Sequence, residues 1–128
     1  MDSSKTFGLT HLSLAVRDTN RTLDFYQKIF DVQVMYHQDG VLQVYTPGCN
    51  DVIVFEEKTN APFGEMGGIS HFGFRLKDPG DIEEITNKVM DADGAITDKG
   101  EFCPGEPYLF FKDPDGYEIE VWYELLPA

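Results

Sequence analysis

Residues 8–18 read GLTHLSLAVRD, and residues 68–78 read GISHFGFRLKD. The two stretches align without a gap at an offset of 60 residues, and His11 falls on His71. In both stretches apolar residues alternate with small or polar ones, which is typical of β-strands with one buried face. An internal repeat therefore decides the fold of this chain, and the two histidines are part of that repeat.

A helical pattern of apolar residues follows each repeated strand. The first helix is expected to begin at Asp18 or Thr19, whose side chains can cap a helix, and the second to open at residues 79–81. Gly94 is expected to end the second helix. Both apolar stripes are predicted to be core: Phe25, Tyr26, Ile29 and Phe30 in the first helix, and Ile82, Ile85, Val89 and Met90 in the second.

Three short strands are predicted after each helix. They lie near residues 33–38, 41–45 and 52–56 in the first half, and near residues 95–99, 108–112 and 117–124 in the second. Asp39-Gly40 marks a hairpin, and residues 100–107 are predicted to be a loop because they include Pro104 and Gly105. The chain therefore reads strand-helix-strand-strand-strand twice.

This order predicts an α+β fold in which two βαβββ modules, related by a pseudo-twofold axis, form a curved mixed sheet around an open cavity. We expect a single domain, with module one over residues 7–57, a linker over 58–67 and module two over 68–125. Packed as equivalents, the modules place both histidines on one face. Small or polar residues share that face: Ser13, Ala15, Gly73 and Arg75. A face without large apolar side chains suits a cavity better than a core.

The last predicted strand supplies acidic side chains to that cavity. Residues 117–122 read YEIEVW, so Glu118, Glu120 and Trp122 share one face of the strand. Two neutral imidazoles and one carboxylate are a ligand set for a divalent metal such as Fe, Mn, Zn, Ni or Co. We therefore expect the two repeated histidines and Glu120 to bind one ion, with coordination positions left open for a substrate.

The first half of the chain lacks an equivalent acid. The counterpart of Glu120 falls at Ile53 or Val54, both apolar, which predicts three protein ligands and leaves Glu56 open as a fourth. Glu120 is also expected to take part in catalysis, with Glu118 as a base or as a partner that orients a ligand. The predicted substrate pocket comprises Ser13, Arg75, Phe110 and Trp122, with Tyr108 and Phe111 as further aromatic walls.

Composition excludes several classes of function. The chain has 128 residues and a formal net charge of −13, which disfavours nucleic acids and acidic membrane surfaces as partners. No run of about 18 apolar residues predicts a membrane span, and the first residues lack the basic-then-apolar pattern of a signal peptide. Cys49 and Cys103 lie in turn-rich segments without metal-type spacing, so a reduced, cytoplasmic setting is expected.

Four stretches give the chain a family resemblance: THLSLAV with His11, LDFYQKIF, GISHFGF with His71, and DPDGYEIEVW with Glu120. On these residues the chain resembles the vicinal oxygen chelate superfamily, which includes glyoxalase I, bleomycin-resistance proteins, fosfomycin-resistance thiol transferases and extradiol dioxygenases. The resemblance implies paired βαβββ modules around a divalent metal, binding of a small substrate through vicinal oxygens, and a homodimer. In many short members each site draws ligands from both subunits, so His11 would complete the site of the partner chain.

Departures from the family patterns bear on which member the chain resembles. Glyoxalase I uses two histidines and two glutamates, and the second glutamate is missing where Ile53 or Val54 stands. Fosfomycin transferases carry a threonine and a tyrosine where Ser13 and Phe110 stand, and they need a more cationic pocket. Bleomycin-binding members usually lack the metal ligands that this chain has. Extradiol dioxygenases share the His-His-Glu set but are longer, and the remaining histidine, His37, is expected on the surface of an edge strand.

Two kinds of chemistry fit three ligands with open coordination. The ligand set favours a metal-dependent enzyme of dioxygenase type that acts on a small oxygenated organic substrate. The alternative enzyme is a lyase or isomerase, in which the metal polarises a carbonyl group while a nearby base moves a proton. The non-enzyme alternative is a dimeric drug-binding protein of the bleomycin-resistance kind.

Overall fold

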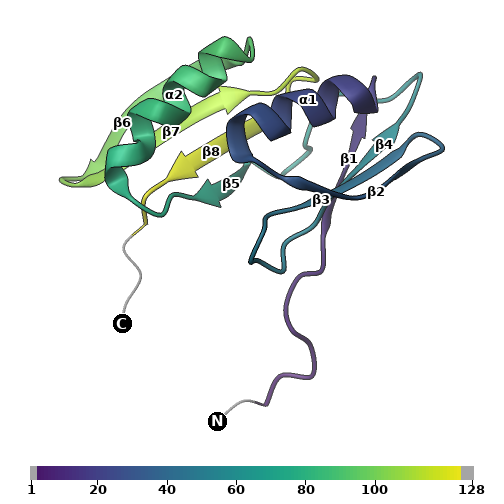
Figure 1. Ribbon diagram of the computed structural model, residues 1–128, viewed down its shortest axis with the longest axis horizontal. Helices are drawn as coiled ribbons and strands as arrows, with labels where there is room; N and C mark the ends of the chain where they lie inside the picture. Colours follow the sequence, from purple (N-terminus) through teal and green to yellow (C-terminus); the bar gives the residue numbers. More distant parts are fainter. Residues whose placement is uncertain (1–2, 125–128) are drawn as a thin grey trace. The chain divides into compact units, whose positions relative to one another are not determined.

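The computed structural model describes residues 3–124 and divides, by its internal contacts, into one unit that ends at Ala61 and a second that begins at Pro62. The first unit contains β1 (Leu12–Val16), α1 (Thr19–Phe30), β2 (Gln33–Gln38), β3 (Val41–Tyr45) and β4 (Ile53–Glu57). The second contains β5 (Phe72–Arg75), a 3₁₀ turn (Pro79–Asp81), α2 (Ile82–Asp91), β6 (Ala95–Cys103), β7 (Glu106–Lys112) and β8 (Glu118–Trp122) (Figure 1). The predicted α+β fold of two βαβββ modules is confirmed.

The two units share one sheet topology. The strand order is β1-β4-β3-β2 in the first and β5-β8-β7-β6 in the second, so that each four-stranded sheet is complete within its own unit. β1 runs parallel to β4 and β5 runs parallel to β8, while the other pairs are antiparallel. The repeated strand that follows each histidine therefore lies at a sheet edge, beside the last strand of its own unit.

In the first unit, α1 lies across one face of the sheet and packs on β3 and β4 (Figure 1). Phe25, Tyr26 and Ile29 are buried, and the ring of Tyr26 lies 4.9 Å from that of Phe55 on β4. The side chain of Asp18 accepts hydrogen bonds from the first backbone N–H groups of the helix, which satisfies donors that would otherwise lack partners. Of the two predicted caps, Asp18 and Thr19, the structure uses Asp18, and α1 begins at Thr19.

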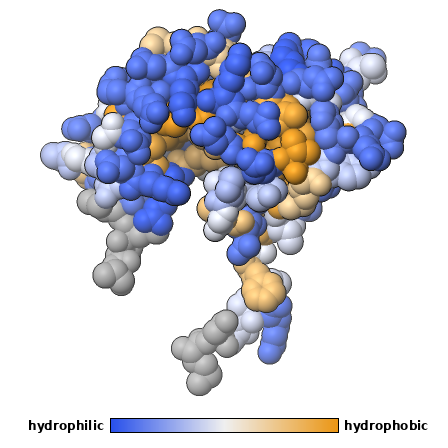
Figure 2. Space-filling view, viewed as in Figure 1, coloured by the Kyte–Doolittle hydropathy of each residue, from blue (hydrophilic) through white to orange (hydrophobic). Residues whose placement is uncertain are grey.

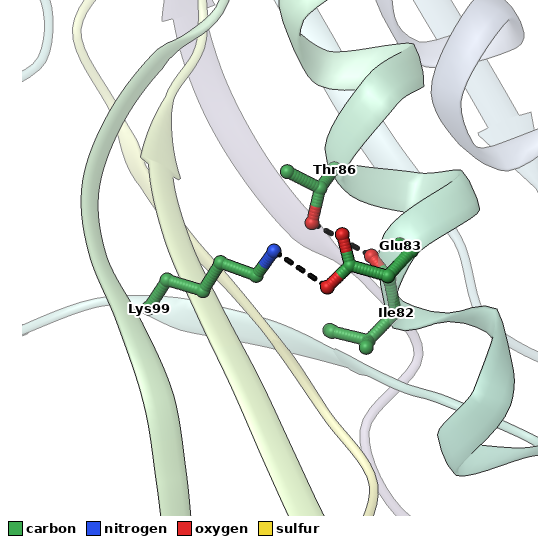
Figure 3. A network of polar contacts seen from close by, with 4 residues as sticks. All are labelled: Ile82, Glu83, Thr86 and Lys99. Atoms are coloured by element: carbon green, nitrogen blue, oxygen red, sulfur yellow. Dashed lines mark hydrogen bonds and ion pairs between the residues drawn. The ribbon is translucent and has the colours of Figure 1, made fainter.

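The core of the second unit differs from the predicted one at Met90. α2 packs on β6 and β7 with Ile82, Thr86 and Val89, whereas Met90 is 53% exposed. Ile82, Thr86 and Val89 lie on one side of the helix, and Met90, one position after Val89, lies at the margin of that buried stripe. Thr86 tolerates burial because its hydroxyl donates to the carbonyl of Ile82 at 2.7 Å (Figure 3).

Lys99 of β6 forms an ion pair with the exposed Glu83 of α2 (Figure 3). The Lys99 ammonium nitrogen lies 2.8 Å from the Glu83 carboxylate oxygen. This pair engages Lys99 on the helix side of the sheet, opposite to the face that carries Glu120.

The end of α2 lies one residue earlier than Gly94 predicts. Asp93 takes the left-handed conformation, with φ 62°, and its N–H donates to the carbonyl of Met90. The N–H of Gly94 donates to the carbonyl of Val89 at 2.8 Å. This pair of hydrogen bonds closes the last turn in a Schellman arrangement, in which the left-handed residue is here an aspartate.

The predicted loop over residues 100–107 is instead mostly a hairpin. β6 continues to Cys103, β7 begins at Glu106, and only Pro104 and Gly105 turn between them. Gly100 lies inside β6 because the ring of Tyr108 occupies the space that a side chain would need: a Cβ there would lie 3.1 Å from the Tyr108 hydroxyl oxygen. The glycine that suggested a loop is thus explained by a contact across the hairpin.

Part of the predicted linker packs on the second unit. Gly64 has φ +76°, and a Cβ at this position would lie 2.7 Å from the carbonyl oxygen of Asp115. The turn that precedes β8 therefore touches the chain at Gly64.

Among the described residues no helix is long and apolar enough to cross a membrane, and Figure 2 shows mainly hydrophilic residues over α1 and α2.

Candidate metal centre

Two predicted ligands meet in the second unit. His71 directly precedes β5, and Glu120 lies at the middle of β8, the parallel neighbour of β5. The Nε2 atom of His71 is 3.6 Å from Oε1 of Glu120. Gly73 pairs with Glu120 across the two strands, and its missing side chain leaves room for the carboxylate.

The surroundings of Glu120 act on its charge in opposite directions. Burial raises the pKa of Glu120 above its ordinary value, the nearby imidazole of His71 lowers it, and Glu124 raises it further. A half-buried carboxylate whose neutral form is favoured gains from any cation beside it. The balance of burial and charge therefore suits a carboxylate that binds a positive group.

The third predicted ligand lies in the first unit. His11 lines a hollow of about 510 Å³ together with Ser13, Val54 and Glu56. The hydroxyl of Ser13 donates to Oε2 of Glu56 at 3.2 Å. In the first unit His11 and Glu56 thus lie on one face of the sheet, as His71 and Glu120 do in the second unit. The two acids nevertheless occupy different strand positions.

The strand registers identify the counterpart of Glu120. Ser13 pairs with Val54 in the first unit, as Gly73 pairs with Glu120 in the second. Val54, rather than Ile53, is therefore the equivalent residue, and Ile53 faces the core. Within neither unit do three His, Cys, Asp or Glu side chains of residues 3–124 gather into a metal-binding group.

Each histidine has a hydroxyl partner that the sequence analysis did not identify. Thr10 Oγ1 lies 2.6 Å from Nδ1 of His11, and Ser70 Oγ lies 3.1 Å from Nδ1 of His71. The signal was present in the repeat, where Thr10 and Ser70 align. In both units Nδ1 is the nitrogen engaged by the protein, so Nε2 is the nitrogen left to meet a ligand.

A family comparison decides the membership of the chain. The family described as the Glyoxalase/Bleomycin resistance protein/Dioxygenase superfamily matches residues 8–121. The chain belongs to this superfamily. The match spans both repeats, including His11, His71 and Glu120, and the predicted resemblance is confirmed.

Two curated relatives of this superfamily member differ in activity. The chain is 26% identical over 119 residues to catechol-2,3-dioxygenase of Bacillus subtilis, a match that covers 88% of the chain and 41% of the relative. It is 23% identical to metallothiol transferase FosB of Bacillus licheniformis, which covers 94% of the chain and 78% of the relative. The chain thus spans about two fifths of the length of the dioxygenase that it matches.

Solved structures of the superfamily share this fold. The fosfomycin resistance protein FosX of Listeria monocytogenes, in a variant complexed with Mn(II) and 1S,2S-dihydroxypropylphosphonic acid, matches with a TM-score of 0.79 at 21% identity. That match covers 94% of the chain and 93% of FosX. FosX of Mesorhizobium loti matches with a TM-score of 0.77 at 17% identity over 94% of the chain and 95% of that protein. At this level of identity the likeness establishes the fold.

The donor chemistry of the superfamily member fits a divalent metal. Imidazole nitrogen and carboxylate oxygen are ligands for Zn, Fe and Mn. Two ligand atoms held about 2.1 Å from one ion lie roughly 3 to 3.5 Å from each other. The 3.6 Å between His71 Nε2 and Glu120 Oε1 is close to that range, so this pair can share one ion with small side-chain adjustments.

Aromatic rings cover the sheet face beside Glu120. His71 meets the edge of Phe110 with ring centroids 4.9 Å apart, and Tyr108 lies beyond it, 5.6 Å from Phe110. Phe102 stacks on Tyr108 at 4.1 Å and meets Trp122 edge-on at 5.2 Å. Phe110 and Trp122 thus share the sheet face that carries Glu120, and the buried indole N–H of Trp122 has no hydrogen-bond acceptor among residues 3–124.

Other predicted site residues take distinct positions. Phe111 is fully buried on the opposite face of β7, so it belongs to the core and the prediction of an aromatic wall there is wrong. Arg75 is exposed and pairs with Trp122, and Glu118 accepts a hydrogen bond from Thr97. His37 lies on the edge strand β2 and is half-buried rather than free on the surface, because its Nε2 bonds the Thr19 hydroxyl at 3.0 Å.

Proposed function

We propose that the protein is a metal-dependent enzyme that acts on a small oxygenated organic molecule, with His11, His71 and Glu120 as the ligands of one divalent ion. The observation that carries the proposal is the approach of His71 Nε2 to Glu120 Oε1, at 3.6 Å, in a chain of the glyoxalase and dioxygenase superfamily. Three ligands leave coordination positions for a substrate, which is the arrangement of catalytic rather than structural sites.

The residues of the second unit support a flat substrate. A divalent ion held by these ligands would supply a centre for two adjacent oxygens of the substrate. Phe110 and Trp122 flank the position of Glu120 and offer apolar surfaces to a planar ring. Arg75, on the same face as Trp122, provides a positive charge for a polar substituent.

These surroundings favour a dioxygenase-type activity over the transfer of a thiol to a phosphonate. A phosphonate carries negative charge and needs several cations around it. Lys99 points to Glu83 on α2 instead of to the site, and the chain as a whole carries a net charge of −13. A catechol-like molecule needs aromatic walls and a metal, and both are proposed here. The similarity to catechol-2,3-dioxygenase agrees with this choice.

A lyase or isomerase is the second candidate, because each unit has a carboxylate that is not proposed as a metal ligand. Glu56 is held by the Ser13 hydroxyl, and Glu118 by the Thr97 hydroxyl, each at 3.2 Å. A carboxylate fixed in this way can accept a proton from a carbon next to a metal-bound carbonyl. A non-catalytic dimer that binds a flat drug in the same cavity is the remaining alternative.

The test begins with metal content. Protein purified without chelators is expected to contain one divalent ion per chain, and Glu120→Gln is expected to lose it, while Glu83→Gln on the exposed side of α2 keeps it. Anaerobic reconstitution with Fe(II) or Mn(II), followed by mixing with a catechol in air-saturated buffer, should give oxygen uptake. Proton exchange on a 2-oxo compound without oxygen uptake would select the lyase or isomerase, and metal-free binding of an aromatic drug would select the binding protein.

We also propose that the protein is a homodimer whose subunits share their sites, as in many short members of the superfamily. In that arrangement His11 of one chain and the other two ligands of the partner chain bind the same ion. Sedimentation of the protein at micromolar concentration measures the oligomeric state. A monomer that holds a full complement of metal would contradict shared sites.

A further inference from the structure

The two hydroxyl–histidine contacts repeat at matching places in two units that otherwise differ. Thr10 Oγ1 lies 2.6 Å from His11 Nδ1, and Ser70 Oγ lies 3.1 Å from His71 Nδ1. Each hydroxyl belongs to the residue directly before the histidine, and each histidine directly precedes an edge strand. The neighbours on the sheet faces differ, with Val54 in one unit where Glu120 stands in the other. The recurrence is therefore a property of the Thr-His and Ser-His pairs themselves.

We propose that Thr10 and Ser70 are positioning residues that orient the two imidazole rings so that Nε2 is the nitrogen available to the ion. A neutral imidazole carries its proton on one nitrogen and a lone pair on the other. When Nε2 gives its lone pair to an ion, the proton is on Nδ1, and Nδ1–H donates to the hydroxyl oxygen. The proposal rests on the proposed metal site, and it assigns to each hydroxyl the ring orientation of its histidine.

The surroundings of His71 agree with this assignment. Its Nε2 is the nitrogen near the Glu120 carboxylate, while Nδ1 faces Ser70. The edge of the ring also packs against Phe110, with the two ring planes 89° apart. The hydroxyl and the aromatic ring thus fix the imidazole from two directions, and Nε2 is directed to the carboxylate. Without an ion, the Glu120 carboxylate favours a proton on Nε2. A bound ion would take the place of that proton, and Nδ1–H would then donate to the Ser70 hydroxyl.

The test compares Thr10→Val and Ser70→Ala, which remove each hydroxyl with little change of shape, with the conservative Thr10→Ser and Ser70→Thr. Thr46→Val is the matched control, because the Thr46 hydroxyl bonds the Asp51 carboxylate and not a histidine. Affinity for Zn(II) and Mn(II) is measured by competition with a chelating dye. The protonation of each histidine nitrogen is read in the zinc-loaded proteins from ¹⁵N-detected histidine spectra, and circular dichroism checks the fold.

The expected result is a protonated Nδ1 and a zinc-bound Nε2 on both histidines of the zinc-loaded wild type, and a roughly 10- to 100-fold weaker metal affinity when either hydroxyl is removed. Thr10→Ser, Ser70→Thr and Thr46→Val should keep the wild-type affinity. Unchanged affinity in Thr10→Val and Ser70→Ala would overturn the inference alone, provided that His71→Ala still abolishes metal binding. A wild type that binds neither ion, or that keeps its affinity in His71→Ala, would overturn the proposed metal site and the inference with it.

Discussion

His71, directly before β5, approaches Glu120 on the neighbouring parallel strand β8, with Nε2 and Oε1 3.6 Å apart, and Gly73 of β5 pairs with Glu120. A Cβ at Gly73 would lie 3.1 Å from the Glu120 carbonyl oxygen and 3.5 Å from its Oε1. The equivalent place in the first repeat holds Ser13, which pairs with the smaller side chain of Val54. The absence of a side chain at Gly73 is thus tied to the carboxylate opposite.

Gly73→Ala is therefore expected to weaken metal binding by roughly tenfold, because the new Cβ presses on the backbone carbonyl of Glu120 and shifts the strand segment that positions the carboxylate. Isothermal titration with Zn(II) measures the affinity. Gly68→Ala is the control, since a Cβ there meets no atom within 4 Å. Equal affinity in Gly73→Ala and the wild type would show that the carboxylate adjusts freely or that Glu120 is not a ligand.

Tyr108 and Asp98 predict a dependence on alkaline pH. The hydrogen bond from the Tyr108 hydroxyl to Asp98, at 3.1 Å, raises the pKa of the phenol above its ordinary value of 10.0, with smaller contributions from burial and from the charge of Asp98. The folded protein therefore retains this proton more strongly than the unfolded chain does. The stability that the pair contributes is fully present below the unfolded pKa and is lost as pH rises through the folded pKa.

Asp98→Asn should lower the pKa of Tyr108, which NMR of ¹³C-labelled tyrosine follows residue by residue. The difference in unfolding midpoint between wild type and Asp98→Asn should also shrink above the ordinary pKa of tyrosine. Glu101→Gln, on the same strand without a contact to Tyr108, serves as the control for the loss of one negative charge. A Tyr108 titration that is identical in Asp98→Asn would contradict the hydrogen bond.

Gly64 and Gly67 allow a matched pair of substitutions in the segment between the repeats. Both have positive φ, +76° and +60°, so that alanine at either position costs roughly 1 kcal/mol of backbone strain. Only Gly64 also lies against the backbone of Asp115 and Gly116. Gly64→Ala should thus lower the free energy of unfolding by at least about 2 kcal/mol, and Gly67→Ala by about 1 kcal/mol. Urea denaturation compares the two, and equal losses would show that the close approach relaxes without cost.

Shared sites in a homodimer make a quantitative prediction for mixed variants. His11→Ala and Glu120→Gln dimers should each lack metal. After denaturation and refolding together, half of the dimers are hybrids with one intact site, so about a quarter of all sites should recover metal. If each chain instead completes its own site, mixing recovers none. Metal content after gel filtration measures the outcome, and refolding of each variant alone provides the baseline.

Much of this architecture could be predicted because periodicity and the repeat report it directly. The alternation in YEIEVW places Glu120 and Trp122 on one face, and the 60-residue offset pairs the histidines. Contacts across strands were not predictable in the same way. Gly100 resembles a chain breaker in the sequence, yet its position answers to the Tyr108 ring on the next strand.

The residues that the sequence did not reveal were missed because their roles depend on three-dimensional contacts. A hydroxyl beside a histidine is common in sequences, and nothing in the period of a strand says that Thr10 bonds the ring of His11. The end of α2 was misjudged because Asp93 and Gly94 are adjacent and either can take the left-handed conformation. Met90 was assigned to the core by its apolarity, although its angle around the helix leaves it in solvent.

The contact of Gly64 with the turn before β8 bears on how this polypeptide can be cut and rejoined. New termini for circular permutation, or a break for fragment complementation, preserve that contact when they are introduced at residues 58–61, whereas an opening at residues 64–67 removes it. The break suited to engineering therefore lies before Pro62, and the glycine-containing stretch after Pro62 is best kept with the C-terminal fragment.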